Sequence, residues 1–159
     1  MKMKKINLLI VIVMAFIAIS CQDTPKKEYS WAYPVAGDWK VNAYVNGALQ
    51  AGGPYEIRTF NSSFGKDSIW VDDYATTSTN GKFWSFKVKT AVNVGAQTFS
   101  TVGSTNAITG YPIKIVVSEG QVIGKDSITM KVVFGDDPTT TYQLAGHRET
   151  SYEDYTINN

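Results

Sequence analysis

Residues 37–47 read GDWKVNAYVNG and alternate between apolar and polar side chains. In an extended chain one face would carry Trp39, Val41, Ala43 and Val45. A period of two with one apolar face is what a half-buried antiparallel strand requires. The Asn46-Gly47 dipeptide that follows favours a tight turn, because both residues tolerate positive φ.

The same alternation recurs in KFWSFKVKT from Lys82, PIKIVV from Pro112 and SITMKVVF from Ser127. Turn sequences separate the runs: Asn80-Gly81, GGP at 52–54, SEGQ at 118–121 and GDDP at 135–138. No window has the apolar spacing of an amphipathic helix. We therefore expect about eight strands, at 37–45, 54–61, 67–73, 82–93, 97–102, 111–118, 126–134 and 139–147. Short strands with regular turns predict an all-β sandwich or barrel.

The pentapeptide GKDSI occurs twice, from Gly65 and from Gly124, each time where a turn leads into an expected strand. We interpret the repeat as one kind of turn used twice. Asp-Ser-Ile also resembles the Asp-Ser/Thr-apolar pattern for O-glycosylation in some Gram-negative bacteria, which would make Ser68 and Ser127 surface sugar sites. A duplicated binding site is disfavoured, because the sequences diverge beyond the pentapeptide.

The first residues have the layout of a secretory signal. MKMKK is a positive segment, INLLIVIVMAFIAI is apolar, and Ser20 is a small residue before Cys21. Residues 18–21 resemble a bacterial lipobox, which implies cleavage before Cys21 and its lipidation. Cys21 is the only cysteine, so no intramolecular disulfide can form. Acyl chains on Cys21 would hold the protein on a membrane without a transmembrane helix.

Gly37-Asp38-Trp39, at the start of the first strand, is similar to the Gly-x-Trp signature of lipocalins and their calycin relatives. In that group the Trp packs across the closed end of the barrel, and an Arg of the last strand lies over it. Arg148, in TYQLAGHRE, occupies the corresponding place here. Over about residues 30–155 the chain also resembles Gram-negative lipoproteins described as lipid-binding putative hydrolases. That resemblance rests on Cys21, AGDWKV, KFWSFKVK and AGHRETSYED.

The resemblance implies an antiparallel up-and-down β-barrel of about eight strands, lipocalin-like, with Gly37, Trp39 and Arg148 as its structural closure. We then expect a lipoprotein signal peptide at 1–20, a lipidated N-terminus and tether at 21–33, the barrel domain at 34–148 and a polar tail at 149–159. The expected location is the Gram-negative cell envelope, as an outer-membrane lipoprotein facing the periplasm or the exterior. A monomer is expected.

The resemblance also implies a lipid or other small hydrophobic ligand. An eight-stranded barrel has an interior that is either packed or able to hold one small ligand. The small residues Ala43, Ser85, Ala145 and Gly146 would leave room. The expected ligand-binding residues are Trp84, Phe86, Ile115, Met130, Val132 and Tyr142. Tyr142 or His147 at the rim would orient the ligand.

Catalytic and metal sites find little support. His147 is the only histidine, and the permanent charge of Arg148 beside it disfavours the imidazolium that a general base must form. There is no Gly-x-Ser-x-Gly elbow. One His and one lipidated Cys cannot supply the ligands of a zinc site. We expect no metal and no cofactor. No basic patch is present, so we expect no nucleic-acid partner.

Three functions remain open. The first is a membrane-anchored barrel that binds a lipid or another small hydrophobic ligand. The second is a non-catalytic cell-surface interaction module that exposes Trp70 and Tyr74 to a glycan or a partner protein. The third is a weak esterase or lipid hydrolase that uses His147.

Overall fold

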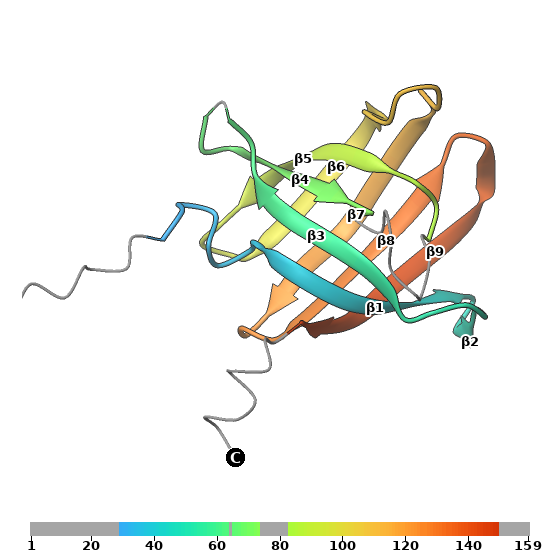
Figure 1. Cartoon of the computed structure of the whole chain (residues 1–159), viewed down its shortest axis with the longest axis horizontal. Coiled ribbons are helices and arrows are strands. Elements are labelled where there is room, and N and C mark those ends of the chain that lie inside the picture. Colours follow the sequence, from blue (N-terminus) through green and yellow to red (C-terminus); the bar gives the residue numbers. More distant parts are fainter. Residues whose placement is uncertain (1–28, 64, 74–82, 150–159) are drawn as a thin grey trace, which may run out of the picture.

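The computed structural model describes residues 29–63, 65–73 and 83–149. Its strands are β1 (Gly37–Val45), β2 (Ala48–Leu49), β3 (Tyr55–Asn61), β4 (Ser68–Asp72), β5 (Lys87–Asn93), β6 (Thr98–Thr105), β7 (Lys114–Ile123), β8 (Ser127–Phe134) and β9 (Asp137–Arg148). Neighbouring strands are antiparallel in the order β2-β1-β3-β4-β5-β6-β7-β8-β9, and β1 also pairs with β9 (Figure 1). This pairing closes the eight long strands into a barrel, with β2 as a short extra strand. The predicted all-β, up-and-down barrel is confirmed.

The first and last long strands meet closely. They pair from Trp39 opposite Arg148 to Tyr44 opposite Gln143. Gly146 permits the approach, because a Cβ atom there would lie 1.9 Å from the carbonyl oxygen of Lys40. Closure leaves no long unpaired edge between β1 and β9, and exposed edges are sites of aggregation.

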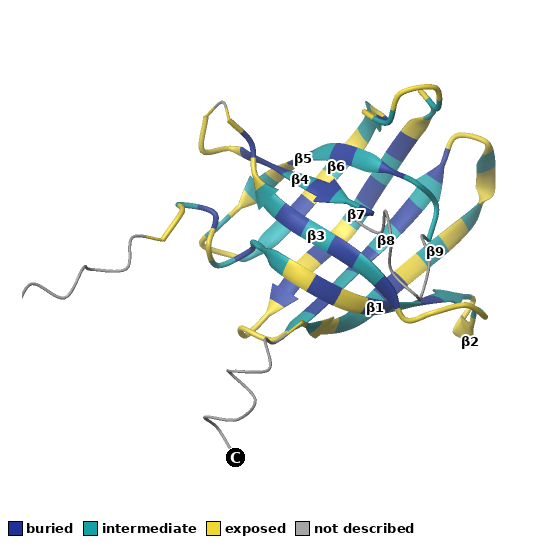
Figure 2. Ribbon diagram, in the orientation of Figure 1, coloured by how far each residue is buried: buried dark blue, intermediate teal, exposed yellow. Residues whose placement is uncertain are grey.

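Alternate residues of each strand point into the barrel. In β1 the side chains of Trp39, Val41 and Ala43 are fully buried. In β8 the pattern runs from Ile128 to Phe134, and Figure 2 shows the resulting bands of buried and exposed residues along the strands. The predicted period of two is therefore confirmed in both strands. Burying these apolar surfaces stabilises the fold by roughly 25 cal/mol per Å².

The two ends of the barrel differ in what covers them. At the closed end, the segment before β1 packs across the opening, and Ala32 and Val35 there are fully buried. Both GKDSI turns lie at this end. The open end carries the connections β1–β3, β4–β5, β6–β7 and β8–β9.

The two GKDSI copies are built alike. Gly65 and Gly124 have φ of 74° and 63°, which suit glycine, and β4 and β8 each begin at the serine of the motif. The carbonyl oxygen of Asp67 accepts a hydrogen bond from Val92 N at 3.0 Å, and that of Asp126 accepts one from Arg148 N at 2.7 Å. Both copies thus combine a glycine in the left-handed region with a strand that begins at the serine, as one kind of turn used twice would require.

The expected strand over 82–93 was wrong at its start, because β5 begins only at Lys87. Ser85 has φ of +55°, outside the extended region. The carboxylate of Asp73 accepts hydrogen bonds from Trp84 N at 2.9 Å and Ser85 N at 2.8 Å through its Oδ2 atom. These bonds take the place of strand pairing, so residues 83–86 leave the sheet.

The SEGQ segment at 118–121 does not form the expected turn. It lies inside β7, which continues to Ile123. The register against β8 shifts between Ser118 and Gln121, and Glu119 has φ of +51°. Polar turn residues here make a β-bulge rather than a chain reversal.

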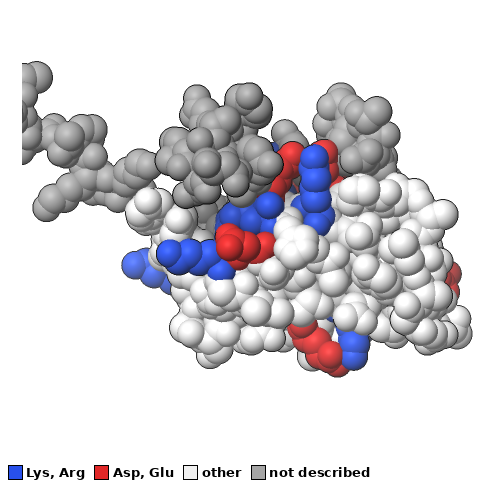
Figure 3. Space-filling view, turned by 90° about the horizontal axis from the view of Figure 1, so that it is seen from below, with Lys and Arg blue, Asp and Glu red and all other residues white. Residues whose placement is uncertain are grey.

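Some of the charged side chains on the outer wall lie in pairs of opposite sign. The pairs are Lys40–Glu149 at 3.1 Å, Arg58–Asp38 at 2.6 Å, Lys87–Asp72 at 3.5 Å and Lys131–Glu119 at 2.7 Å. On the face in Figure 3, basic and acidic groups lie beside one another and a broad area is uncharged. Exposed pairs of this kind stabilise a fold by about 0–1 kcal/mol each.

Candidate ligand-binding site

The closed end is sealed by Arg148 stacked on Trp39. The guanidinium carbon of Arg148 lies 4.3 Å from the centre of the Trp39 ring. Arg148 also donates hydrogen bonds to the carbonyl oxygens of Ala36 at 2.8 Å and Lys125 at 2.7 Å. A Cβ atom at Gly37 would lie 2.1 Å from Arg148 Nη1, so a larger residue there would displace the guanidinium or shift the strand. The residues expected to form the closure thus lie in contact.

Beneath this stack lies a buried hydrogen-bond chain. The Trp39 indole N–H donates to the Thr59 hydroxyl at 2.9 Å, and that hydroxyl donates to the carbonyl oxygen of Val35 at 2.6 Å. Both side chains are buried. The chain ties the N-terminal segment to the barrel wall, so this end is a fixed floor and not an entrance.

Six aromatic side chains meet at the open end, and we call them the mouth cluster: Tyr55, Phe83, Trp84, Phe86, Phe134 and Tyr142. Trp84 and Phe134 stack with centroids 4.6 Å apart and planes 12° apart. Phe83 meets Tyr142 edge to face at 5.3 Å. Phe86 and Phe134 are fully buried, whereas Phe83, Trp84 and Tyr142 are partly exposed. An aromatic surface therefore runs from solvent into the core.

Two buried polar side chains position the Trp84 segment. Asp73, 5% exposed, binds the backbone of residues 84 and 85, and its own N–H donates to the carbonyl oxygen of Phe86 at 2.8 Å. Asn106, 4% exposed, accepts from Lys87 N at 2.8 Å and donates to the carbonyl oxygen of Ser85 at 3.1 Å. The segment is thus held by side chains of the β4–β5 and β6–β7 connections.

Two carboxylates, those of Asp136 and Asp137, accept the hydrogen bonds at the edge of the mouth cluster. Trp84 Nε1 donates to the Tyr111 hydroxyl at 2.9 Å, and that hydroxyl donates to Asp136. The Tyr142 hydroxyl donates to Asp137 Oδ2 at 2.8 Å. Burial, and then the bond to Asp137, raise the pKa of Tyr142 to about 12. The bond to Asp136, with burial, raises the pKa of Tyr111.

The expected ligand-binding residues divide into two groups. Trp84, Phe86 and Tyr142 belong to the mouth cluster, and the Trp84 and Tyr142 centroids lie 5.1 Å apart. The deeper residues Ile115, Met130 and Val132 are fully buried in the core. Whether any of them touches a ligand stays a prediction.

The expected ligand-binding residues did not include Tyr55, Phe83, Phe134 or Tyr111. Phe134 is the last apolar residue in the alternating pattern of β8, so the sequence does predict that it is buried. In an unbroken strand over 82–93, Phe83 would lie on the face opposite Trp84 and Phe86. Nothing in the sequence signals that Tyr111 meets Trp84, since the contact joins two separate loops.

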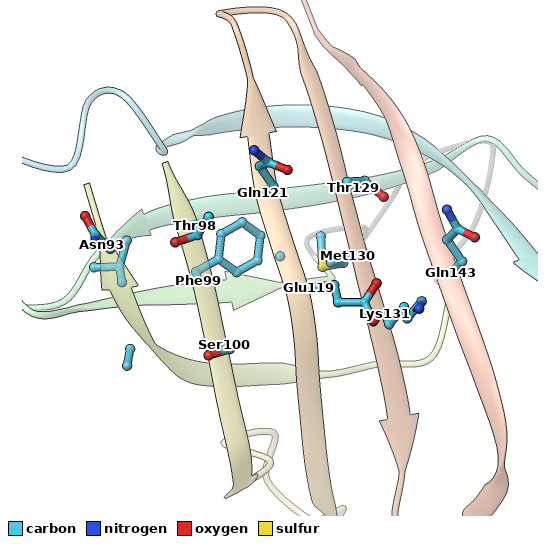
Figure 4. Close-up of a pocket in the computed structure, with 13 residues that line it drawn as sticks. Asn93, Thr98, Phe99, Ser100, Glu119, Gln121, Thr129, Met130, Lys131 and Gln143 are labelled. Carbon is cyan, nitrogen blue, oxygen red and sulfur yellow. Dashed lines mark hydrogen bonds and ion pairs between the residues drawn. The ribbon is translucent and has the colours of Figure 1, made fainter. Parts of the chain in front are cut away.

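Two hollows lie on the outer wall of the barrel. The larger, of about 780 Å³, is open and crosses β5 to β9 (Figure 4). Six of its thirteen lining residues carry an amide or a hydroxyl: Asn93, Thr98, Ser100, Gln121, Thr129 and Gln143. The second, of about 490 Å³, shares Ala91 and Ser100 with it. Large apolar side chains occupy the barrel interior itself.

The candidate catalytic and glycosylation residues also lie away from the mouth. His147 is exposed on the outer wall, with Nδ1 3.4 Å from Ser127 Oγ. Ser68 is buried, and its hydroxyl lies 3.0 Å from Ser62 Oγ and 3.1 Å from Asp67 Oδ1. A sugar on Ser68 would have to break these contacts. Ser127 is partly buried and faces outward. Cys21 and Tyr74 lie outside the described residues.

Within the described ranges, no three His, Cys, Asp or Glu side chains gather as metal ligands would. The same ranges contain no helix with the length and apolarity to cross a bilayer.

Comparison with known proteins gives one match. No curated protein matches the chain. Residues 24–153 match the model of a family described as "Lipid-binding putative hydrolase". The match covers the whole barrel, the closure and the mouth cluster. The chain therefore belongs to the lipid-binding putative hydrolase family.

Proposed function

We propose that this barrel binds a lipid or another small hydrophobic molecule at its open end. The observation that carries the proposal is the mouth cluster, whose partly exposed members Phe83, Trp84 and Tyr142 lie directly against the buried Phe134. A ligand that displaces them outward would bury its own apolar chain against the core. Membership of a lipid-binding family supports the same conclusion.

The ligand would enter by replacing side chains and not by filling an empty chamber. The interior positions at the level of Phe134, Phe86 and Met130 are occupied. Phe83 and Trp84 precede β5 and are free of strand pairing, so their displacement breaks no sheet ladder. Apolar burial favours such an exchange by roughly 25 cal/mol per Å² of surface removed from water. The barrel wall and its floor would stay fixed.

We further propose that lipidated Cys21 anchors the protein to the outer membrane of a Gram-negative cell. The chain enters the barrel at the closed end, where Val35 and Ala36 contact Thr59 and Arg148. A tether arriving there places the mouth at the opposite end of the molecule. The ligand would then reach the mouth from the side away from the anchor.

The decisive experiment is a ligand titration of the full chain, held in amphipol, with dodecanol as the probe and tryptophan fluorescence as the signal. Trp84→Ala should abolish most of the signal, because Trp84 is the tryptophan of the mouth cluster and is displaced when the ligand binds. Trp70→Ala is the matched control, since Trp70 is a partly buried tryptophan on the outer wall. Equal losses in both variants, or no binding to the native protein, would contradict the proposal.

A second candidate is an interaction module that holds a glycan on the outer wall. The joined hollows favour it, because their amide and hydroxyl side chains suit polyhydroxylated ligands. Gln121→Ala should then abolish glycan binding and leave dodecanol binding unchanged. An esterase finds less support: the Ser127–His147 contact is exposed, and His147 pairs with Lys40 across the strands.

A further inference from the structure

The mouth of the barrel offers hydrogen-bond acceptors where a ligand head group would lie. The side-chain donors at the aromatic mouth include Trp84 Nε1 and the hydroxyls of Tyr111, Tyr142 and Tyr55. Each already donates to a protein atom. Trp84 Nε1 donates to the Tyr111 hydroxyl, which donates to Asp136. The Tyr142 hydroxyl donates to Asp137.

The backbone of the same segment is used in the same way. The N–H groups of Trp84 and Ser85 both donate to Asp73. The hydrogen bonds on two sides of the mouth are therefore accepted by carboxylates, on one side by Asp73 and on the other by Asp136 and Asp137. A carboxylate has about four lone-pair sites, so Asp136 and Asp137 can still accept from a ligand.

The Lys and Arg side chains that the structure describes lie away from the aromatic mouth. Four of them pair with acids on the outer wall: Lys40, Arg58, Lys87 and Lys131. Lys66, Lys125 and Arg148 lie at the closed end, and Lys89 lines the smaller outer hollow. Lys114 begins β7 near the open end, but its aliphatic chain lies against Gly103 on the outer wall. The described charges beside the mouth are thus Asp73, Asp136 and Asp137.

We propose that the ligand is a lipid whose head group donates hydrogen bonds and carries no negative charge, such as a hydroxyl or an ammonium group. Its head would bind Asp136 and Asp137, and its chain would enter the mouth cluster. An anionic head group would be repelled by these carboxylates. The inference rests on the proposed function, because it names the class of ligand for the same site.

The test compares three probes of equal chain length, dodecanol, dodecylamine and dodecanoate, at neutral pH on the full chain in amphipol. Quenching of Trp84 fluorescence reports occupancy of the mouth, and Trp84→Ala gives the background. Dodecanol and dodecylamine should bind at least about tenfold more tightly than dodecanoate, because their head groups can donate a hydrogen bond to a carboxylate and that of dodecanoate cannot.

The double variant Asp136→Asn, Asp137→Asn should lose most of this preference. The matched control is Asp126→Asn, because Asp126 is an exposed carboxylate in a turn at the closed end. Equal or tighter binding of dodecanoate by the native protein would overturn the head-group assignment and leave the carrier function intact. Absence of any Trp84-dependent binding would overturn the carrier function itself. If the double variant is unstable, the ranking of the three probes on the native protein decides alone.

Discussion

Arg148 and Trp39 are direct partners across the seam between β9 and β1, and the guanidinium of Arg148 covers the indole. The contact joins the last long strand to the first, so it can form only when the barrel is closed. A cation on an indole face contributes about 0.5–2 kcal/mol. The two carbonyl hydrogen bonds of Arg148 fix its position over the ring.

Replacing Gly37 tests this closure. In Gly37→Ala the new Cβ would overlap Arg148 Nη1, so the guanidinium must leave the ring or the strand must shift. We expect the free energy of unfolding to fall by about 1–3 kcal/mol, the usual cost of overpacking. Urea denaturation followed by fluorescence measures it. Gly95→Ala is the control, because its Cβ would meet only Asn93 Oδ1, at 3.6 Å, and a change within about 0.5 kcal/mol is expected.

Thr59 links Trp39 to the N-terminal segment. Thr59→Val keeps the shape but leaves the Trp39 N–H and the Val35 carbonyl without their partner. Leaving buried polar groups unsatisfied costs about 1–3 kcal/mol each, so thermal or urea unfolding should show a loss of about 2 kcal/mol or more. Thr90→Val is the matched control, since Thr90 is equally buried but its hydroxyl bond to Ile69 is long, at 3.5 Å. Equal losses at both positions would contradict a special role for Thr59.

The sequence predicts the strands of the barrel better than it predicts the arrangement of the mouth cluster. In β1 and β8 the side chains that alternate in sequence also alternate between core and solvent, because both strands are regular throughout their length. The conformation of residues 83–86 does not follow from the alternation of apolar and polar side chains in their own sequence. Their course depends on Asp73, at the other end of the same connection, and on Asn106 of the β6–β7 connection, which both bind their backbone. Likewise, the bulge at Glu119 depends on pairing with β8, and the sequence alone reads it as a turn.

Ser85 offers a direct test of that unpredicted segment. A non-glycine residue at φ of +55° costs about 1–2 kcal/mol, so Ser85→Gly should raise the free energy of unfolding by up to about 1 kcal/mol. Ser85→Val should lower it, because a β-branched side chain tolerates this conformation least. Chemical denaturation of both variants measures the difference. The opposite order, with valine favoured, is what an unbroken strand over 82–93 would give.

The raised pKa of Tyr142 makes the free energy of unfolding depend on pH in a predictable direction. The pKa of Tyr142 is raised in the folded protein to about 12 from the ordinary value of 10, by burial and by the bond to Asp137. Below pH 10 both the folded and the unfolded states keep the proton, so this contribution to stability is fully present. Between 10 and about 12 the unfolded state loses its proton first, and the free energy of unfolding falls.

Tyr142→Phe should therefore flatten the decline in stability across that window, at the cost of the Asp137 hydrogen bond at neutral pH, about 0.5–1.5 kcal/mol. Urea unfolding from neutral pH upward measures both effects in one series. Asp137→Asn separates the two causes, because it removes the negative charge and leaves Tyr142 buried. A midpoint for Tyr142 ionisation that stays near 12 in Asp137→Asn would assign the shift to burial alone. A midpoint that moves towards 10 would show that the carboxylate holds the proton at the mouth.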